Sequence, residues 1–141
     1  MFVGAAFCTP ADSFLSSSMG NVPVYLGLAE IGGSIQPCKV VSGFLPPVRV
    51  PYGGGEYYVH GDYWIVPFDG SRMEWVATDH GHPPLGKRPV EGGREADGRT
   101  LVHAIGEVDG VRVVGKAGEH LGGANLPFAG KERHVDYYEV L

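Results

Sequence analysis

Short segments in which apolar residues alternate with polar or small ones, each bounded by glycine, follow one another along the chain. This period of two residues is typical of β-strands, and no window of ten residues has apolar positions at helical spacing. Turns that contain glycine follow two of the segments, at Ile31-Gly32-Gly33 and Val108-Asp109-Gly110, and predict hairpins there. The predicted strands are 22–30, 34–40, 48–52 and 57–66, and then 100–107, 111–117, 125–128 and 133–141.

The second group of predicted strands repeats the first. Lys39 matches Lys116 at an offset of about 77 residues, the run 50–59 matches 126–135 at about 76, and 63–66 matches 138–141 at about 75. A unit of this length usually buries its apolar face against its twin. We therefore expect an all-β protein in which two pseudo-symmetric antiparallel β repeats pack into one compact body. The expected division is repeat 1 at 1–68, a joint at 69–74 and repeat 2 at 75–141.

Composition narrows the classes of partner. The chain has 141 residues and a net charge of -5, and it has no basic stripe to neutralise a nucleic-acid backbone. No apolar run approaches the roughly 20 residues that span a bilayer. The apolar start, residues 1–7, is too short for a signal-peptide core, which predicts a cytoplasmic or leaderless secreted protein. Cys8 and Cys38 form one pair at most, and we expect two buried free thiols rather than a bridge.

Several residues invite a catalytic or metal-binding interpretation that their context does not favour. Glu56 and Glu132 are paired carboxylates such as a glycosidase uses, but each lies in the glycine-rich turn of its own repeat, where a shared role in turn geometry is expected. His80 and His82 have the spacing of two zinc ligands, without a third ligand at useful spacing. No nucleophile and base are placed together by a motif. We expect no enzyme activity, no catalytic residue, no metal and no cofactor.

Glu95 and Lys116 offer a different chemistry. Glu95 precedes the strand that opens at Leu101, and Lys116 ends the strand that returns from it, so the two side chains are expected at one rim of the hairpin. A carboxylate accepts hydrogen bonds from neighbouring hydroxyls of a sugar and an ammonium donates to their oxygens, so this pair suits a diol. The alternative is a surface ion pair worth at most about 1 kcal/mol.

Several ordered motifs resemble the DM-nine repeat family over nearly the whole chain. In repeat 2 they are residues 91–98, 115–116, 127–132 and 138–141, opened by Trp75-Val76, and in repeat 1 the weaker set 37–39, 51–56 and 63–65. The resemblance implies an all-β protein of two tandem repeats. The family includes small mannose-binding lectins of innate immunity that form homodimers, and its repeat also occurs as the lectin module of natterin-like pore-forming toxins.

The resemblance also implies the positions of a sugar site. In the family's mannose-specific lectins an aspartate and the lysine of a Gly-Lys step contact the sugar, and these positions fall on Glu95 and Lys116. Asp97 replaces Glu95 if the register slips by two residues. In repeat 1 the lysine survives as Lys39, but the acid position falls near Ser18 or Met19. We expect one good site in repeat 2 and a degenerate one in repeat 1.

These inferences predict a carbohydrate-binding lectin for terminal mannose or a related hexose. Its expected partners are mannose-type glycans on a microbial or glycoprotein surface and a second copy of the chain. The homodimer is motivated by aromatic residues that we expect to be exposed, namely Trp64, Trp75, Tyr137 and Tyr138. The rival interpretation is a structural or interaction module without sugar binding, or a fragment of a natterin-like pore-forming protein.

Overall fold

The computed structural model describes residues 2–3, 13–16, 22–41, 48–59, 62–90 and 92–141. Strands dominate this part of the chain; it contains one 3-10 helix, η3 (Glu119–Leu121), and no α-helix. The predicted all-β fold is therefore confirmed. The strands of the first half are β1 (Phe2–Val3), β2 (Ser13–Ser16), β3 (Val22–Ile31), β4 (Ser34–Val41), β5 (Val48–Tyr52), β6 (Gly55–Val59) and β7 (Tyr63–Val66). Those of the second half are β8 (Val76–Asp79), β9 (Gly93–Arg94), β10 (Thr100–Val108), β11 (Val111–Gly118), β12 (Gly123–Phe128), β13 (Lys131–Val135) and β14 (Tyr137–Val140).

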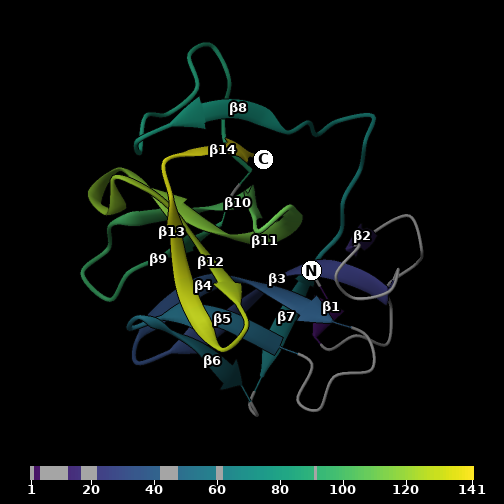
Figure 1. Ribbon diagram of the computed structural model, residues 1–141, viewed down its shortest axis with the longest axis vertical. Helices are drawn as coiled ribbons and strands as arrows, with labels where there is room; N and C mark the ends of the chain where they lie inside the picture. Colours follow the sequence, from purple (N-terminus) through teal and green to yellow (C-terminus); the bar gives the residue numbers. More distant parts are fainter. Residues whose placement is uncertain (1, 4–12, 17–21, 42–47, 60–61, 91) are drawn as a thin grey trace.

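The order of strands in the sheet is palindromic. It runs β1-β7-β3-β4-β5-β6 through the first half and then β13-β12-β11-β10-β14-β8 through the second. Each first-half strand on this path thus has a counterpart at the mirrored place in the second half, with β3 matching β10 and β4 matching β11, while β2 and β9 lie off the path. In Figure 1 the blue strands of the first half lie below most of the second half, and the yellow β13 reaches down to their level, where it neighbours β6. The predicted pseudo-symmetry is a property of the strand pairing.

The two long hairpins follow the predicted pattern closely. The β3–β4 pairing closes at Ile31↔Ser34 and the β10–β11 pairing at Val108↔Val111. Both turns need left-handed backbone, which Gly32 and Gly33 supply in the first and Asp109 and Gly110 in the second. The long strands predicted over 57–66 and 133–141 are each broken in two, giving β6 with β7 and β13 with β14. The break lets β7 and β14 pair with β3 and β10 on the other side of each hairpin.

The halves meet where the tips of two hairpins exchange hydrogen bonds. The Glu56 amide donates to the Gly130 carbonyl at 3.2 Å, and the Glu132 amide donates to the Gly54 carbonyl at 3.2 Å. The side chains repeat the exchange, because Glu56 accepts from the Gly130 amide at 2.8 Å and Glu132 from the Gly54 amide at 3.0 Å. Both glutamates therefore brace the turn of the opposite half, which agrees with a role in turn geometry.

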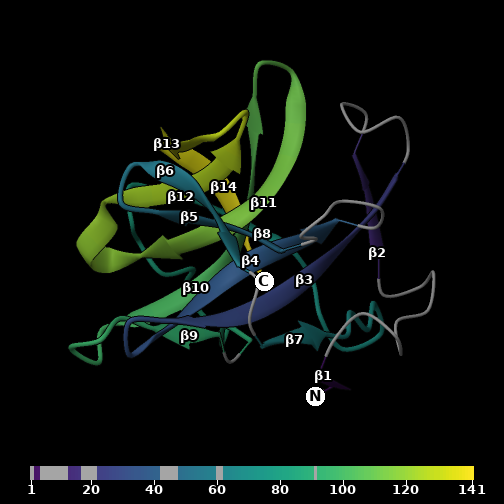
Figure 2. The same cartoon turned by 90° about the horizontal axis from the view of Figure 1, so that it is seen from below.

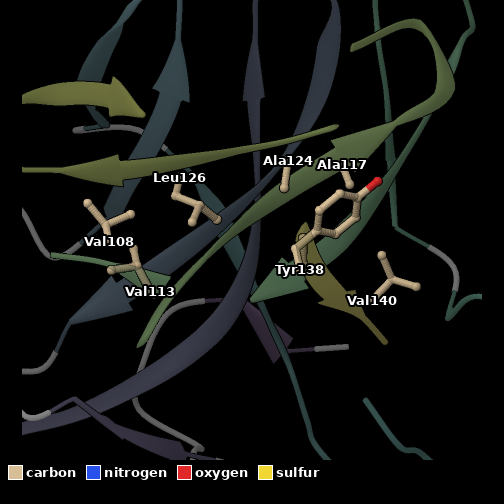
Figure 3. Close-up of a cluster of buried hydrophobic side chains, with 8 residues drawn as sticks. Val108, Val113, Ala117, Ala124, Leu126, Tyr138 and Val140 are labelled. Atoms are coloured by element: carbon tan, nitrogen blue, oxygen red, sulfur yellow. The ribbon is translucent and has the colours of Figure 1, made fainter. Parts of the chain in front are cut away.

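The hydrophobic core has one cluster in each half and a third that both halves share. Figure 3 shows the cluster of the second half, in which Tyr138, Leu126 and Ala117 face one another from β14, β12 and β11. The shared cluster joins Leu26, Leu28, Val41 and Val66 of the first half to Val114 and Leu141 of the second. This shared burial makes the chain one body, because neither half alone covers these side chains.

Two expectations about exposure and thiols meet different outcomes. Four aromatic residues are expected from the sequence to be exposed. Tyr137 is exposed, at 72%. Trp64 and Trp75 are half-buried and pack against the shared cluster. The expectation of exposure is wrong for Tyr138, which is buried. Cys38 is a buried free thiol whose pKa is raised by burial, as expected, and Cys8 lies outside the described residues. None of the described residues forms a helix that is long and apolar enough to cross a membrane.

Candidate functional site

Strand β9 places Glu95 against the other half of the molecule. It pairs with β10 of its own half, Arg94 opposite Thr100, and with β4 of the first half, Arg94 opposite Ile35. Figure 2 shows β9 lying beside β10 near the turn of β3 and β4. Gly93 is required for this approach, since a Cβ there would lie 1.8 Å from the Ile35 carbonyl oxygen. Glu95 follows directly and therefore faces the seam between the halves.

A buried glutamine of the first half joins Glu95 to Lys116. The amide nitrogen of Gln36 donates to Glu95 Oε1 at 2.9 Å, and its oxygen accepts from Lys116 Nζ at 2.7 Å. Gln36 is 0% exposed, so its amide is fixed by these contacts and by a further bond to Ser34. The predicted pair is thus brought to one place by an amide that bridges them, rather than by a surface ion pair.

The surroundings of Glu95 and Lys116 lower the pKa of each side chain. Burial alone would raise the pKa of Glu95, but hydrogen bonds from Gln36 and His120 and the charge of Lys116 outweigh it and lower that pKa. Burial lowers the pKa of Lys116, against the opposing charges of Glu132 and Glu95. At neutral pH Glu95 is ionised, since its pKa lies below an already acidic reference value. Glu95 remains 22% exposed and Lys116 is 4% exposed, so the carboxylate forms the accessible side of the site.

His120 and Tyr52 complete the surroundings. His120 follows β11 in η3, and its Nε2 lies 3.0 Å from Glu95 Oε2. Tyr52 comes from the first half, at the end of β5, and its ring centroid lies 5.5 Å from Lys116 Nζ. The cluster of Gln36, Tyr52, Glu95, Lys116 and His120 is called the seam site below. Both halves contribute to it.

The other two predicted site residues lie elsewhere. Asp97 is in the turn after β9, where its carboxylate binds the Arg99 side chain at 2.8 Å. Lys39 occupies the place in β4 that Lys116 occupies in β11, but its Nζ donates to the Pro127 carbonyl at 2.7 Å and lies 3.9 Å from Glu56. Ser18 and Met19, near the expected acid position of repeat 1, lie outside the described residues. A sugar-binding role for Asp97 or Lys39 stays a prediction.

Sequence reasoning missed Gln36, Tyr52 and His120. Gln36 stands about 77 residues before Val113, its counterpart in the second half, so a polar residue replaces an apolar one at a position that both halves bury. That asymmetry was the available signal for Gln36. Tyr52 corresponds to Phe128 and gave no such signal, because both are aromatic.

A cavity of about 370 Å³ adjoins the seam site, because His120 of the seam site is one of its lining residues. Its lining includes Val102 and Ala117, which are cross-strand partners, whereas Lys116 is one residue away and points to the opposite face. Arg99 also lines the cavity, and its guanidinium donates a hydrogen bond to the Asp97 carboxylate. Glu95 and Lys116 are not among the lining residues, so His120 is the part of the seam site that borders this cavity.

The candidate zinc ligands are engaged with acids. His80 Nδ1 and His82 Nδ1 lie 3.4 Å and 3.0 Å from the same oxygen of Asp79. Within the part of the chain that the structure describes, no group of three or more His, Cys, Asp or Glu side chains is arranged to hold a metal ion. Each histidine therefore serves the turn after β8 in this structure.

A palindromic all-β fold with a charged, hydrogen-bonded cluster at its seam defines a tandem-repeat module suited to binding. The model of the DM9 repeat matches residues 18–135, which is most of the chain. The protein belongs to the DM9 repeat family, as the sequence resemblance indicated. No curated protein matches the sequence. The family and the fold are consistent with a carbohydrate-binding or interaction module and suggest a protein that is not an enzyme.

Proposed function

We propose that the protein is a lectin that binds a terminal mannose or a related hexose in the seam site. The observation that supports this function is the convergence of Glu95 and Lys116, from separate segments, on the buried Gln36 amide. Burying and fixing two charged groups at a partly open seam costs free energy that a purely structural surface pair would not require. Matching polar groups of a bound ligand would offset that cost.

The two charged groups suit adjacent hydroxyls of a pyranose. Each carboxylate oxygen of Glu95 has one partner in the protein: Oε1 accepts from Gln36, and Oε2 lies beside His120 Nε2. Both oxygens have further lone pairs that can accept hydrogen bonds from sugar hydroxyls. Lys116 has three donors, of which one goes to Gln36. Hydrogen bonds to charged groups contribute about 1.5–3 kcal/mol each, so the acid and the lysine both contribute strongly to affinity.

The test is a titration of the intact protein with methyl α-mannoside, followed by calorimetry or ligand-observed NMR. Glu95→Gln and Lys116→Met keep the shapes of the side chains and remove their charges, and each is expected to weaken binding roughly 10- to 100-fold. Lys39→Met is the matched control, because this lysine occupies the equivalent strand position but is turned to Pro127. Circular dichroism verifies that each variant is folded.

The outcomes separate the lectin from its rival. Binding by the wild type and by Lys39→Met, with loss in the other two variants, supports the proposal. If a glycan array with wild-type protein shows no binding to any hexose, the lectin function is wrong and a structural or interaction module remains.

We also propose a homodimer, because a single sugar site of this size is weak and two linked sites raise the effective concentration. Tyr137, exposed to 72%, is the residue of the original aromatic set that a partner copy could cover. Sedimentation that shows a monomer at micromolar concentration contradicts this part of the proposal.

A further inference from the structure

We infer that Tyr52 is a ligand-contacting residue of the seam site: an aromatic platform from the first half against which the C–H face of a pyranose packs while Glu95 and Lys116 hold its hydroxyls. This inference rests on the proposed function and specifies the ligand further. The ligand is a ring-closed hexose with one apolar face, not any molecule that carries a diol.

The position of the ring carries the inference. Lys116 Nζ lies 5.5 Å from the Tyr52 ring centroid, so the ring is adjacent to the donor that would bind a sugar oxygen. Lys116 itself is 4% exposed, whereas Tyr52 is 39% exposed. The aromatic ring is therefore the part of this contact that a ligand reaches from solvent.

The backbone around Tyr52 leaves its exposed side open. Two glycine turns lie near Tyr52: Gly53-Gly54 follows it directly in the chain, and Gly32-Gly33, between β3 and β4, comes nearest to it at Gly32. A Cβ built on Gly33, Gly53 or Gly54 would meet no atom within 4 Å, and one on Gly32 would meet only the Tyr52 hydroxyl, at 3.9 Å. No side chain from these turns covers the ring, so a ligand can approach it closely.

The chemistry of the ring fits one face of a sugar. The face of a phenol ring carries negative charge density, which attracts both the lysine ammonium and the weakly positive C–H groups of a pyranose. Polar groups beside it bind the hydroxyls at the edge of the same pyranose. An aromatic face next to a carboxylate and an ammonium thus recognises the two kinds of surface that a hexose has.

The β5–β6 hairpin has three exposed tyrosines, and the one that lies beside Lys116 is Tyr52. Tyr57 lies edge-on to Tyr52, with centroids 6.4 Å apart, and Tyr58 stacks on the Arg49 guanidinium at 4.2 Å. Tyr58 is 48% exposed and lies on the same hairpin, which makes it a matched control.

The experiment measures binding of methyl α-mannoside and of mannitol to full-length wild-type protein and to Tyr52→Phe, Tyr52→Leu and Tyr58→Ala. Mannitol keeps adjacent hydroxyls but has no pyranose face. Tyr52→Leu is expected to weaken binding of the mannoside about 10-fold, because aromatic packing of this kind contributes on the order of 1 kcal/mol and part of the contact area is also lost. Tyr52→Phe and Tyr58→Ala are expected to bind within about 2-fold of the wild type, and mannitol is expected to be insensitive to position 52.

The NMR shifts of the sugar protons test direct contact with the Tyr52 ring, because a tyrosine with a purely structural role would cause no ring-current shift in the ligand. Upfield shifts of the sugar C–H protons are expected with wild type and Tyr52→Phe and not with Tyr52→Leu. If the wild type binds, Glu95→Gln abolishes binding and Tyr52→Leu binds normally, the platform is wrong while the lectin function stands. If the wild type binds neither ligand nor any other hexose, both are wrong.

Discussion

The two halves of the molecule carry the same row of cross-strand neighbours and use it differently. In the first half the row is Leu26, Lys39, Arg49 and Tyr58, and in the second it is His103, Lys116, Asn125 and His134. Lys39 is closed off by the Pro127 carbonyl and by Glu56, which also lies 3.5 Å from Arg49. Lys116 instead donates to Gln36, beside the partly exposed Glu95. Equivalent strand positions thus give a sealed charge cluster in one half and an accessible one in the other.

The position of the partner acid makes this difference. The second half has Asn125 where the first has Arg49, so Glu132 binds an amide rather than a second cation. Glu95 then supplies the carboxylate that remains within reach of solvent. A duplicated fold can therefore keep its backbone symmetric while a few changed side chains give an accessible charge cluster in one copy and a sealed one in the other.

The row also contains a buried histidine that the first half replaces with leucine, and this gives the largest predicted effect. His103 is 0% exposed, neither of its ring nitrogens has a hydrogen-bond partner among the described residues, and burial lowers its pKa to about 4. The unfolded chain binds a proton to this ring below about pH 6.5, where the folded protein does not. His103 therefore destabilises the fold progressively as the pH falls from about 6.5 to about 4.

His103→Leu, which copies Leu26, is expected to raise the free energy of unfolding by about 1–3 kcal/mol at pH 7, because unpaired buried polar atoms are removed. The advantage over wild type is expected to grow by roughly 2 kcal/mol at pH 5, since the variant lacks this proton uptake. Urea denaturation at the two pH values measures both. An advantage that does not change with pH contradicts the account of the buried imidazole.

The two exchanged glutamates test the sealed cluster against the open one. Glu56→Gln leaves Lys39 and Arg49 without their shared carboxylate and is expected to cost about 2–3 kcal/mol of stability. Glu132→Gln leaves one acceptor oxygen for two donors, the Gly54 amide and the Asn125 side-chain amide, but removes no ion pair among the described residues, and is expected to cost about 1 kcal/mol for the hydrogen bond that is lost. Equal losses in a denaturation experiment would show that the two clusters are energetically alike.

The smallest effect is expected from Asp97. Asp97→Ala removes an exposed pair with Arg99 and should change neither stability nor mannoside affinity measurably. The matched Glu95→Ala variant should lose binding, because Glu95 is the acid in the seam site. The same calorimetric titration measures the affinity of Asp97→Ala. A loss of affinity in this variant would show that Asp97, and not Glu95, is the acid that binds the sugar, and would contradict the contrast between the two charge clusters.

The sequence predicted what depends on local pattern and on the repeat. Alternating residues and the glycine turns placed β3, β4, β10 and β11 to within a residue or two, and the offset between copies matched Lys39 with Lys116. The pairing of the hairpin tips across the halves and the role of Gln36 were not predictable in this way. Gln36 is separated from Glu95 by 59 residues and from Lys116 by 80, and no local property of the chain reports such contacts. They follow from how the shared core docks one half on the other.

β9 pairs with a strand of each half, so the sugar binding proposed for the seam site would depend on docking of the two halves. A chain whose second half had formed without docking on the first would possess Glu95 and Lys116 but would lack both the strand that orients the one and the amide that steadies the other. Under the proposed function such a half-assembled molecule would bind sugar weakly, because its acid and its lysine are not held in place. A ligand that binds only the docked form should stabilise that form and so oppose separation of the two halves.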